Sequence, residues 1–322
     1  MRLTAEQIYD KLIREDEILS LNGQIKFYLG DVNIIVKQRD VVGNIMQEWL
    51  QGWLDARGIE YAPSENTQMP PDFYLNPDDK TVNLLEVKAF NYSGSPGFDI
   101  ADFRMYAQEI QEKPYMLDVD YLIFGYDMDV ETGTVTIKKV WLKKVWQITR
   151  RMEDHALNLQ VKDGVIHKIR PGVWYSDHAV DYSIFESLED FISAVDDTVY
   201  REPRLRDTIA TTWLSKFQRN YRNRYGKELN VPRWSEIKDK YDVVSVRRFE
   251  KAMLELQKVE QKIEKEEARA ARYREAVDVA KTEKQLQKAE ENLSKAEISL
   301  EKAIEKRNAM KTKVEMYNIR MK

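Results

Sequence analysis

The sequence predicts an α/β fold in which a mixed β-sheet is flanked by helices and followed by a C-terminal α-helical arm. Between residues 41 and 126 the pattern of apolar residues indicates a helix, three strands, a helix and a strand, an order that requires a mixed sheet covered by helices. From residue 249 onward there is no Gly or Pro, and Glu, Lys, Ala, Gln and Leu recur in a helical pattern. A chain of 322 residues accommodates one full-sized globular domain and such an appendage.

Local patterns predict each element in turn. Residues 24–37 form two β-rich runs around a Gly-Asp pair, which indicates a hairpin. Val42, Ile45, Met46, Trp49 and Trp53 share one face of a helix that ends near Gly58. The further predicted elements are strands at 59–63, 72–76, 82–90, 120–126 and 134–142 and helices at 98–113 and 143–152, whereas residues 156–200 show no clear pattern.

Composition limits the classes of protein to consider. The chain has no Cys, which excludes disulfides, thiol nucleophiles and cysteine-ligated metals and suits a reducing cytoplasm. It has no run of about 18 apolar residues and its start is an amphipathic helix, so we expect a cytoplasmic protein without a membrane partner. The formal net charge is -4, but residues 201–248 contain 13 Lys or Arg against 6 Asp or Glu. These features divide the chain into three parts: a globular domain at 1–200, a basic, aromatic-rich helical segment at 201–248 and the arm at 249–322.

One short motif suggests chemistry. Asp72 follows a proline and opens one predicted strand, and Glu86 and Lys88 lie on the next strand after two leucines. Alternation along a strand points Glu86 and Lys88 to one face, and a hairpin would bring Asp72 beside them. Two carboxylates at one sheet edge suit Mg²⁺, which binds phosphate oxygens. Lys88 is then expected to orient an attacking water and to offset charge in the transition state.

The alternative is that these are ordinary strand-end charges, because a bare D-x(n)-E-x-K pattern is common by chance. The context favours the functional interpretation. Burying charges in an apolar strand requires a partner or a metal.

The segment PDFYLNPDDKTVNLLEVKAFNYSGSPGFDI resembles the active-site region of type II restriction endonucleases of the PD-(D/E)XK superfamily, and most closely the NgoBV group. The resemblance extends to about residue 240 and does not cover the arm. It implies that Asp72, Glu86 and the backbone carbonyl of Val87 are metal ligands and that Lys88 is the catalytic lysine. It also implies a PD-(D/E)XK nuclease core and a palindromic target of the GGNNCC kind.

Other residues are candidates around this motif. Related nucleases often add an acidic residue from the preceding helix, and Glu48 is the candidate here, although it could equally face solvent. Asn91, Ser93 and Ser95 follow the catalytic strand and are expected to donate hydrogen bonds to DNA phosphates. Asp99 is expected to cap the helix that follows.

The basic segment carries an aromatic stripe at four-residue spacing, which is expected to pack in the core: Trp213, Phe217, Tyr221 and Tyr225. Arg219, Arg222 and Arg224 flank the stripe. They are interpreted as a phosphate footprint or as base readers, with a solvated charged face as the alternative.

The arm shows two apolar seams. From Leu286, apolar or small residues alternate at spacings of three and four, as in a coiled coil. An earlier seam through Leu256 and Ile263 is out of frame with it by two residues, so the helix either bends near 281–285 or folds back as an antiparallel hairpin.

The leading hypothesis is a homodimeric restriction endonuclease in which each subunit cuts one strand of double-stranded DNA. Two alternatives stay open: a repair or junction-resolving nuclease on the same fold, and a non-catalytic DNA-binding or scaffolding protein assembled through the arm.

Overall fold

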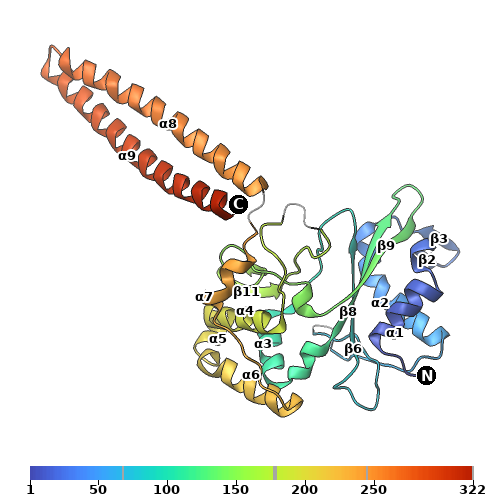
Figure 1. Cartoon of the computed structure of the whole chain (residues 1–322). Helices are drawn as coiled ribbons and strands as arrows, with labels where there is room; N and C mark the ends of the chain where they lie inside the picture. The colour runs from blue at the N-terminus through green and yellow to red at the C-terminus, as the bar shows by residue number, and fades with distance from the viewer. Residues whose placement is uncertain (67–68, 177–179, 244–245, 321–322) are drawn as a thin grey trace. The chain divides into compact units, whose positions relative to one another are not determined.

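A computed structural model describes residues 1–66, 69–176, 180–243 and 246–320, and it divides into two compact units. The first unit comprises Met1–Asp177 and Tyr182–Asp242, and the second comprises His178–Asp181 and Val243–Lys322. The basic segment up to residue 242 therefore belongs to the first unit and shares its core, while the two long helices form a unit of their own (Figure 1).

The first unit is built on a six-stranded mixed sheet with the order β1-β9-β8-β6-β5-β4. Only β6 and β8 pair in parallel, and the helix α3 (Phe103–Glu112) lies between them in the chain. All the other pairs in this sheet are antiparallel. The strands are β1 (Asn22–Gln24), β4 (Ala62–Pro63), β5 (Phe73–Tyr74), β6 (Leu84–Asn91), β8 (Asp120–Met128) and β9 (Thr134–Lys143). The predicted mixed sheet with flanking helices is thus present.

Both faces of this sheet are buried, which explains why β6 and β8 are apolar nearly throughout. Leu85 and Val87 face one core, which they share with α1 (Ala5–Asp10) and α2 (Arg39–Ala56). Leu84 and Phe90 face the opposite core together with α3, so Glu86 and Lys88 lie on the α3 side by alternation.

Residues 156–200, which showed no clear pattern, supply much of this second core. They contain β10 (Leu159–Lys162) and β11 (Val165–Ile169), which form a small sheet with β7 (Ala101–Asp102), and the helix α4 (Leu188–Arg201). Three further helices complete this side of the unit: α5 (Pro203–Arg206), α6 (Ala210–Tyr225) and α7 (Trp234–Ile237). In α6 three residues of the predicted aromatic stripe, Trp213, Phe217 and Tyr221, are buried, and Tyr225 is partly buried.

Two local predictions are wrong. The expected helix at 143–152 is only a 3₁₀ turn at Val145–Gln147. The backbone carbonyls that follow this turn accept hydrogen bonds from distant residues; the Gly172 N–H, for example, donates to the Ile148 carbonyl at 2.8 Å. These carbonyls are therefore not available for the hydrogen bonds of a helix. The cap of α3 is Asp102, which accepts from the Met105 N–H at 3.1 Å, whereas Asp99 pairs with Arg170.

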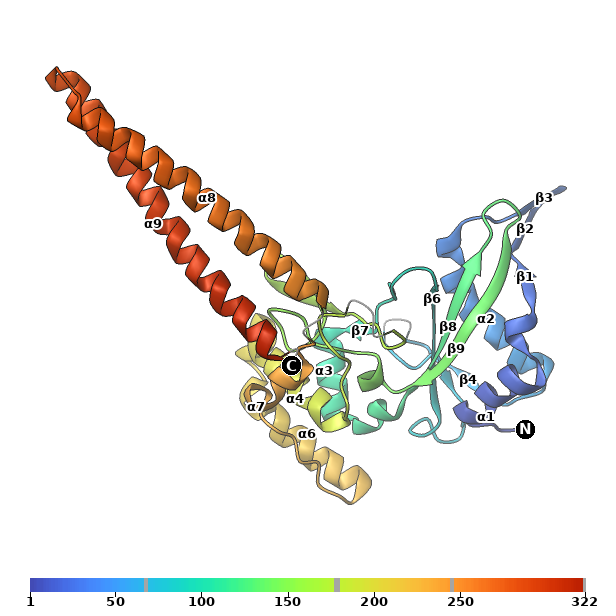
Figure 2. The same ribbon diagram turned by 45° about the horizontal axis from the view of Figure 1, so that its top comes forward.

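The second unit contains α8 (Val246–Asp278) and α9 (Glu283–Arg320), which pack against each other as an antiparallel hairpin (Figures 1 and 2). Leu256 lies in a cluster with Met310, and Arg274 forms an ion pair with Glu297 at 2.8 Å. Buried residues on α9 recur every seven positions: Ala289, Ala296, Ala303, Met310 and Tyr317. The out-of-frame seams therefore belong to two helices that face each other, not to one bent helix.

Candidate active site

Asp72 is held against the edge of β6 by two hydrogen bonds. Its N–H donates to the Leu85 carbonyl at 3.0 Å, and its Oδ2 accepts from the Val87 N–H at 2.8 Å. The short antiparallel pairing of β5 with β6 ends at Leu85. Beyond this point the Asp72 carboxylate, in place of a backbone carbonyl of β5, accepts the hydrogen bond from the next outward-facing N–H of β6, that of Val87. Because the N–H and C=O of one residue point to the same side of a strand, the Val87 carbonyl is directed to this side too.

Glu86 and Lys88 lie on one face of β6, as alternation predicts, and form an ion pair with 2.7 Å between Nζ and Oε1. The side chain of Lys88 is 22% exposed, whereas the residue Glu86 is only 4% exposed. The second carboxylate oxygen, Oε2, is buried and has no hydrogen-bond partner. Burying an acceptor without a partner costs free energy, so the structure leaves this oxygen in an unfavourable environment.

The three charged groups influence one another strongly. The pKa of Glu86 is raised from 4.5 to about 7, chiefly by burial; Lys88 opposes this shift and Asp72 adds to it. Burial also raises the pKa of Asp72, although the hydrogen bond from the Val87 N–H and the nearby Lys88 both act to lower it. Burial alone would lower the pKa of Lys88, but Glu86 and Asp72 outweigh it and raise the value. The lysine is therefore a permanent cation beside two destabilised carboxylates.

A cleft of roughly 600 Å³ lies along this part of β6. Val87 and Lys88 line it, whereas the carboxylates of Asp72 and Glu86 are not among its lining groups. The opposite wall is a stripe of α2 at helical spacing: Asp40, Gly43, Asn44 and Gln47. This stripe is polar and was not predicted, although its i, i+3, i+4, i+7 spacing is visible in the sequence.

Glu48 is not brought to the cleft. It is exposed on α2, one residue after Gln47. Trp49, predicted on the core face of this helix, is 38% exposed, and the buried face runs through Met46, Leu50 and Trp53. This rotation of the helix turns Gln47 to the cleft and Glu48 away from it.

The loop after β6 closes one end of the cleft. Asn91 and Ser95 line it. Ser93 donates through both its N–H and its hydroxyl to Asn91 Oδ1, at 3.1 and 2.6 Å, and is not a lining residue. Arg170 pairs with Asp99 and donates to the Gly97 carbonyl at 2.9 Å, so the far end of the loop is fixed.

The three predicted arginines of α6 are all exposed. Arg222 pairs with Glu228 at 2.8 Å, and Arg224 donates to Thr81 Oγ1 at 3.0 Å. Arg219 has no hydrogen bond or ion pair with the part of the chain that the structure describes. None of the three lines the cleft.

A family model described as NgoBV restriction endonuclease matches residues 2–241, which is most of the chain. The chain belongs to this family. It is 63% identical over 241 residues to the type II restriction enzyme NlaIV of Neisseria lactamica, a match that covers 75% of this chain and 98% of that relative. It is 60% identical over 162 residues to the type II restriction enzyme NgoBV of Neisseria gonorrhoeae, covering 50% and 91% of the two chains.

A solved NlaIV restriction endonuclease structure superimposes with a TM-score of 0.72, covering 75% of this chain and 98% of that one at 63% identity. The family span includes the cleft and the whole motif from Asp72 to Lys88. The family model ends at residue 241, so α8 and α9 lie outside the residues that it matches.

Proposed function

We propose that this chain is a Mg²⁺-dependent type II restriction endonuclease with a PD-(D/E)XK core, which hydrolyses double-stranded DNA through Asp72, Glu86 and Lys88. The observation that carries the proposal is the convergence of these residues at one edge of β6. Asp72 is hydrogen-bonded to Val87 at 2.8 Å, and Lys88 is paired to Glu86 at 2.7 Å beside the cleft.

The donor set fits a hard divalent cation. Asp72 and the unpartnered Oε2 of Glu86 supply carboxylate oxygens, and the Val87 carbonyl adds a neutral oxygen on the same side. No cluster of three Asp, Glu or His suited to a metal is found among the described residues, so water and DNA phosphate would complete the shell. When bound, Mg²⁺ would polarise the scissile phosphate and make water a better nucleophile.

The remaining roles, in catalysis and in DNA binding, are proposed for other residues of the chain. Lys88 reaches the cleft with a fixed positive charge, which positions a water and stabilises the charge that develops on the phosphate. Asn91 and Ser95 line the same cleft and are proposed to contact DNA. Arg219, Arg222 and Arg224 lie outside it and are proposed to contact phosphates of the flanking duplex.

We further propose that the enzyme acts in the cytoplasm as a homodimer on a palindrome of the GGNNCC kind. A two-fold symmetric target matches a two-fold symmetric protein, in which each copy cuts one strand. No helix among the described residues is long and apolar enough to cross a membrane.

The test is digestion of a supercoiled plasmid that contains a single GGNNCC-type site, with Mg²⁺. Linear product of one length is expected. Lys88→Ala should lower the cleavage rate by roughly 100- to 1000-fold, since it removes one preorganised charge. Its binding to the site in Ca²⁺ should not change. Lys139→Ala, at an exposed position of β9, is the matched control.

Three results would contradict the proposal. Nicks or smears without a discrete band would indicate a repair-type nuclease, and absence of cleavage would indicate a binding protein. Full activity of Lys88→Ala would remove this lysine from the mechanism.

A further inference from the structure

The strands β2 (Lys26–Leu29) and β3 (Val32–Ile35) form a two-stranded ribbon that pairs with no other described strand. All eight residues are exposed. The register pairs Phe27 with Ile34 and Leu29 with Val32, so these four side chains share one face. They are 55%, 53%, 72% and 65% exposed, respectively. One whole face of the ribbon is therefore apolar and uncovered in a single copy of the chain.

The base of the ribbon is fixed to the turn between β8 and β9. The Val36 N–H donates to the Ile25 carbonyl at 2.9 Å, and Gln24 donates to the Thr132 carbonyl at 3.3 Å. A Cβ on Gly133 would come within 2.5 Å of Ile35 Cγ2, so Ile35 packs closely on this glycine. The ribbon thus has a defined base, although two strands alone are only marginally stable in water.

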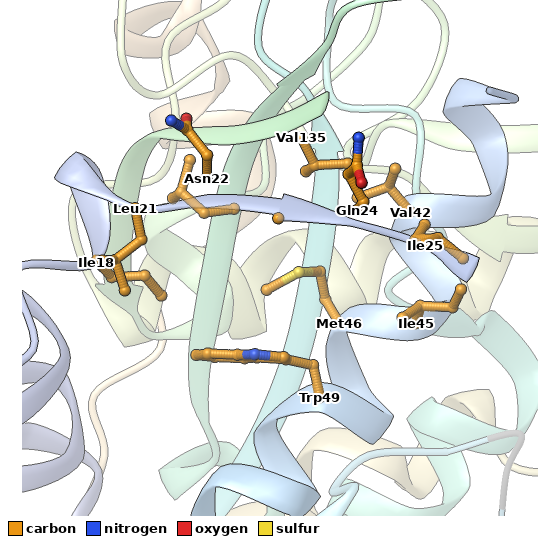
Figure 3. Close-up of a pocket in the computed structure, with 12 residues that line it drawn as sticks. Ile18, Leu21, Asn22, Gln24, Ile25, Val42, Ile45, Met46, Trp49 and Val135 are labelled. Carbon is orange, nitrogen blue, oxygen red and sulfur yellow. The ribbon is translucent and has the colours of Figure 1, made fainter. Parts of the chain in front are cut away.

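The apolar face continues into a pocket at the base. Ile25 precedes β2 by one residue and pairs with Val36, so alternation places it on the side of Phe27 and Leu29. Ile25 also lines a pocket of roughly 210 Å³ beneath β1, together with Leu21 and Trp49 (Figure 3). Leu21 is 51% exposed and Trp49 is 38% exposed.

We propose that the ribbon and this pocket form the contact between two copies of the chain. The apolar face carries no charged side chain, which makes it unsuited to DNA phosphate. The ribbon protrudes beside the pocket. In a two-fold symmetric dimer, the ribbon and pocket of each copy would contact the same surface of the other copy.

The area also fits a second copy. If a large apolar side chain offers roughly 170 Å², the exposed fractions of the four ribbon residues amount to roughly 400 Å². Leu21 and Trp49, which line the pocket, raise the total to roughly 550 Å², about two thirds of the roughly 800 Å² that each partner buries in a standard interface.

The position of this patch connects it to the active site. α2 begins at Arg39, four residues after the ribbon ends, and its first turns line the cleft. The Tyr126 hydroxyl donates to the Arg39 carbonyl at 2.7 Å, which fixes this end of α2 to β8. If the proposed function holds, a contact through the ribbon would set the spacing of two clefts on one duplex.

The experiment compares full-length wild type with Leu29→Asp and Val32→Lys by sedimentation velocity over a range of concentrations. The matched control is Tyr28→Asp, which introduces the same negative charge as Leu29→Asp but on the opposite face of the ribbon, at a position 66% exposed. Wild type and the control should be dimers. The two test variants should weaken dimerisation by roughly 100-fold or more, because a charge would be buried in the contact. Tryptophan emission and circular dichroism check that they remain folded.

Each variant is also assayed on a supercoiled plasmid with one target site, which separates this inference from the proposed function. Monomeric variants that nick the plasmid but lose concerted linearisation would support both. A wild-type dimer that Leu29→Asp and Val32→Lys leave intact, or a monomeric wild type, would overturn the ribbon contact even if cleavage is normal. A dimer that depends on the ribbon but cuts no DNA would overturn only the function.

Discussion

Replacing Glu86 with Gln should make the metal-free protein more stable while abolishing its cleavage. Glu86 is 4% exposed, and its Oε2 has no hydrogen-bond partner. Glutamine keeps the shape of the side chain and an acceptor for Lys88 but removes the buried charge. Without a bound cation, the buried charge of Glu86 should therefore lower the free energy of unfolding.

The magnitude follows from the pKa of Glu86, which burial raises from 4.5 to about 7. The folded protein retains this proton up to about pH 7, whereas the unfolded chain releases it near 4.5, so stability falls as pH rises between these values. The full cost is present above that range and amounts to about 3 kcal/mol at about 1.4 kcal/mol per pKa unit. For a unit of this size it corresponds to roughly 6 to 12 °C in melting temperature. The gain from Glu86→Gln should be large at pH 8.5 and nearly absent at pH 4.

Unfolding is followed by tryptophan emission in EDTA at both pH values. All seven tryptophans lie between Trp49 and Trp234, so the signal reports the first unit and not the helical hairpin. Glu48→Gln, at an exposed position on α2, is the control and should not change stability. Equal stability of wild type and Glu86→Gln at pH 8.5 would refute the reasoning, as would a less stable variant. Added Mg²⁺ should narrow the difference by stabilising only the wild type.

Two further predictions concern the parts outside the cleft. Neutralising Arg219, Arg222 and Arg224 together should weaken DNA binding and lower the slope of log affinity against log salt by roughly 0.9 for each phosphate that the protein no longer neutralises, and an unchanged slope in binding titrations would assign them to a solvated surface. Deleting residues 249–322 should leave a folded core, because the first unit has its own hydrophobic clusters and the family model ends at residue 241, before the hairpin. Sedimentation should show the same oligomeric state for the truncated and full-length proteins, and a truncated core that cannot fold or becomes monomeric would contradict this.

Local pattern was sufficient for several features of the site. The alternation that points Glu86 and Lys88 to one face is a property of any strand, and their 2.7 Å ion pair agrees with it. The hairpin at 24–37 followed from the Gly-Asp turn, and the burial of Trp213 and Phe217 followed from their four-residue spacing. In each case the interacting residues are close in sequence or share a regular repeat.

Other features depended on contacts between distant segments. α2 is rotated so that Gln47, and not Glu48, faces the cleft, and its packing on β6 and β8 sets this rotation. The sequence of α2 does not specify the rotation, because the helix has apolar residues on more than one side. Residues 143–152 do not form the predicted helix, because their carbonyls accept hydrogen bonds from Gly172 and Phe185. These donors are distant in sequence, so the local pattern does not reveal them.

The sequence by itself determined the strand-borne Asp72, Glu86 and Lys88 motif, the mixed α/β architecture and the separate helical arm, because each rests on a repeat or a composition shift along the chain. Only the tertiary structure decided which wall faces the motif, how the two seams of the arm meet and which apolar residues remain uncovered. Whether Phe27 or Leu29 is core or surface depends on what else packs there. A β-ribbon with an apolar face has the same sequence pattern whether it is buried in its own chain or awaits a second copy.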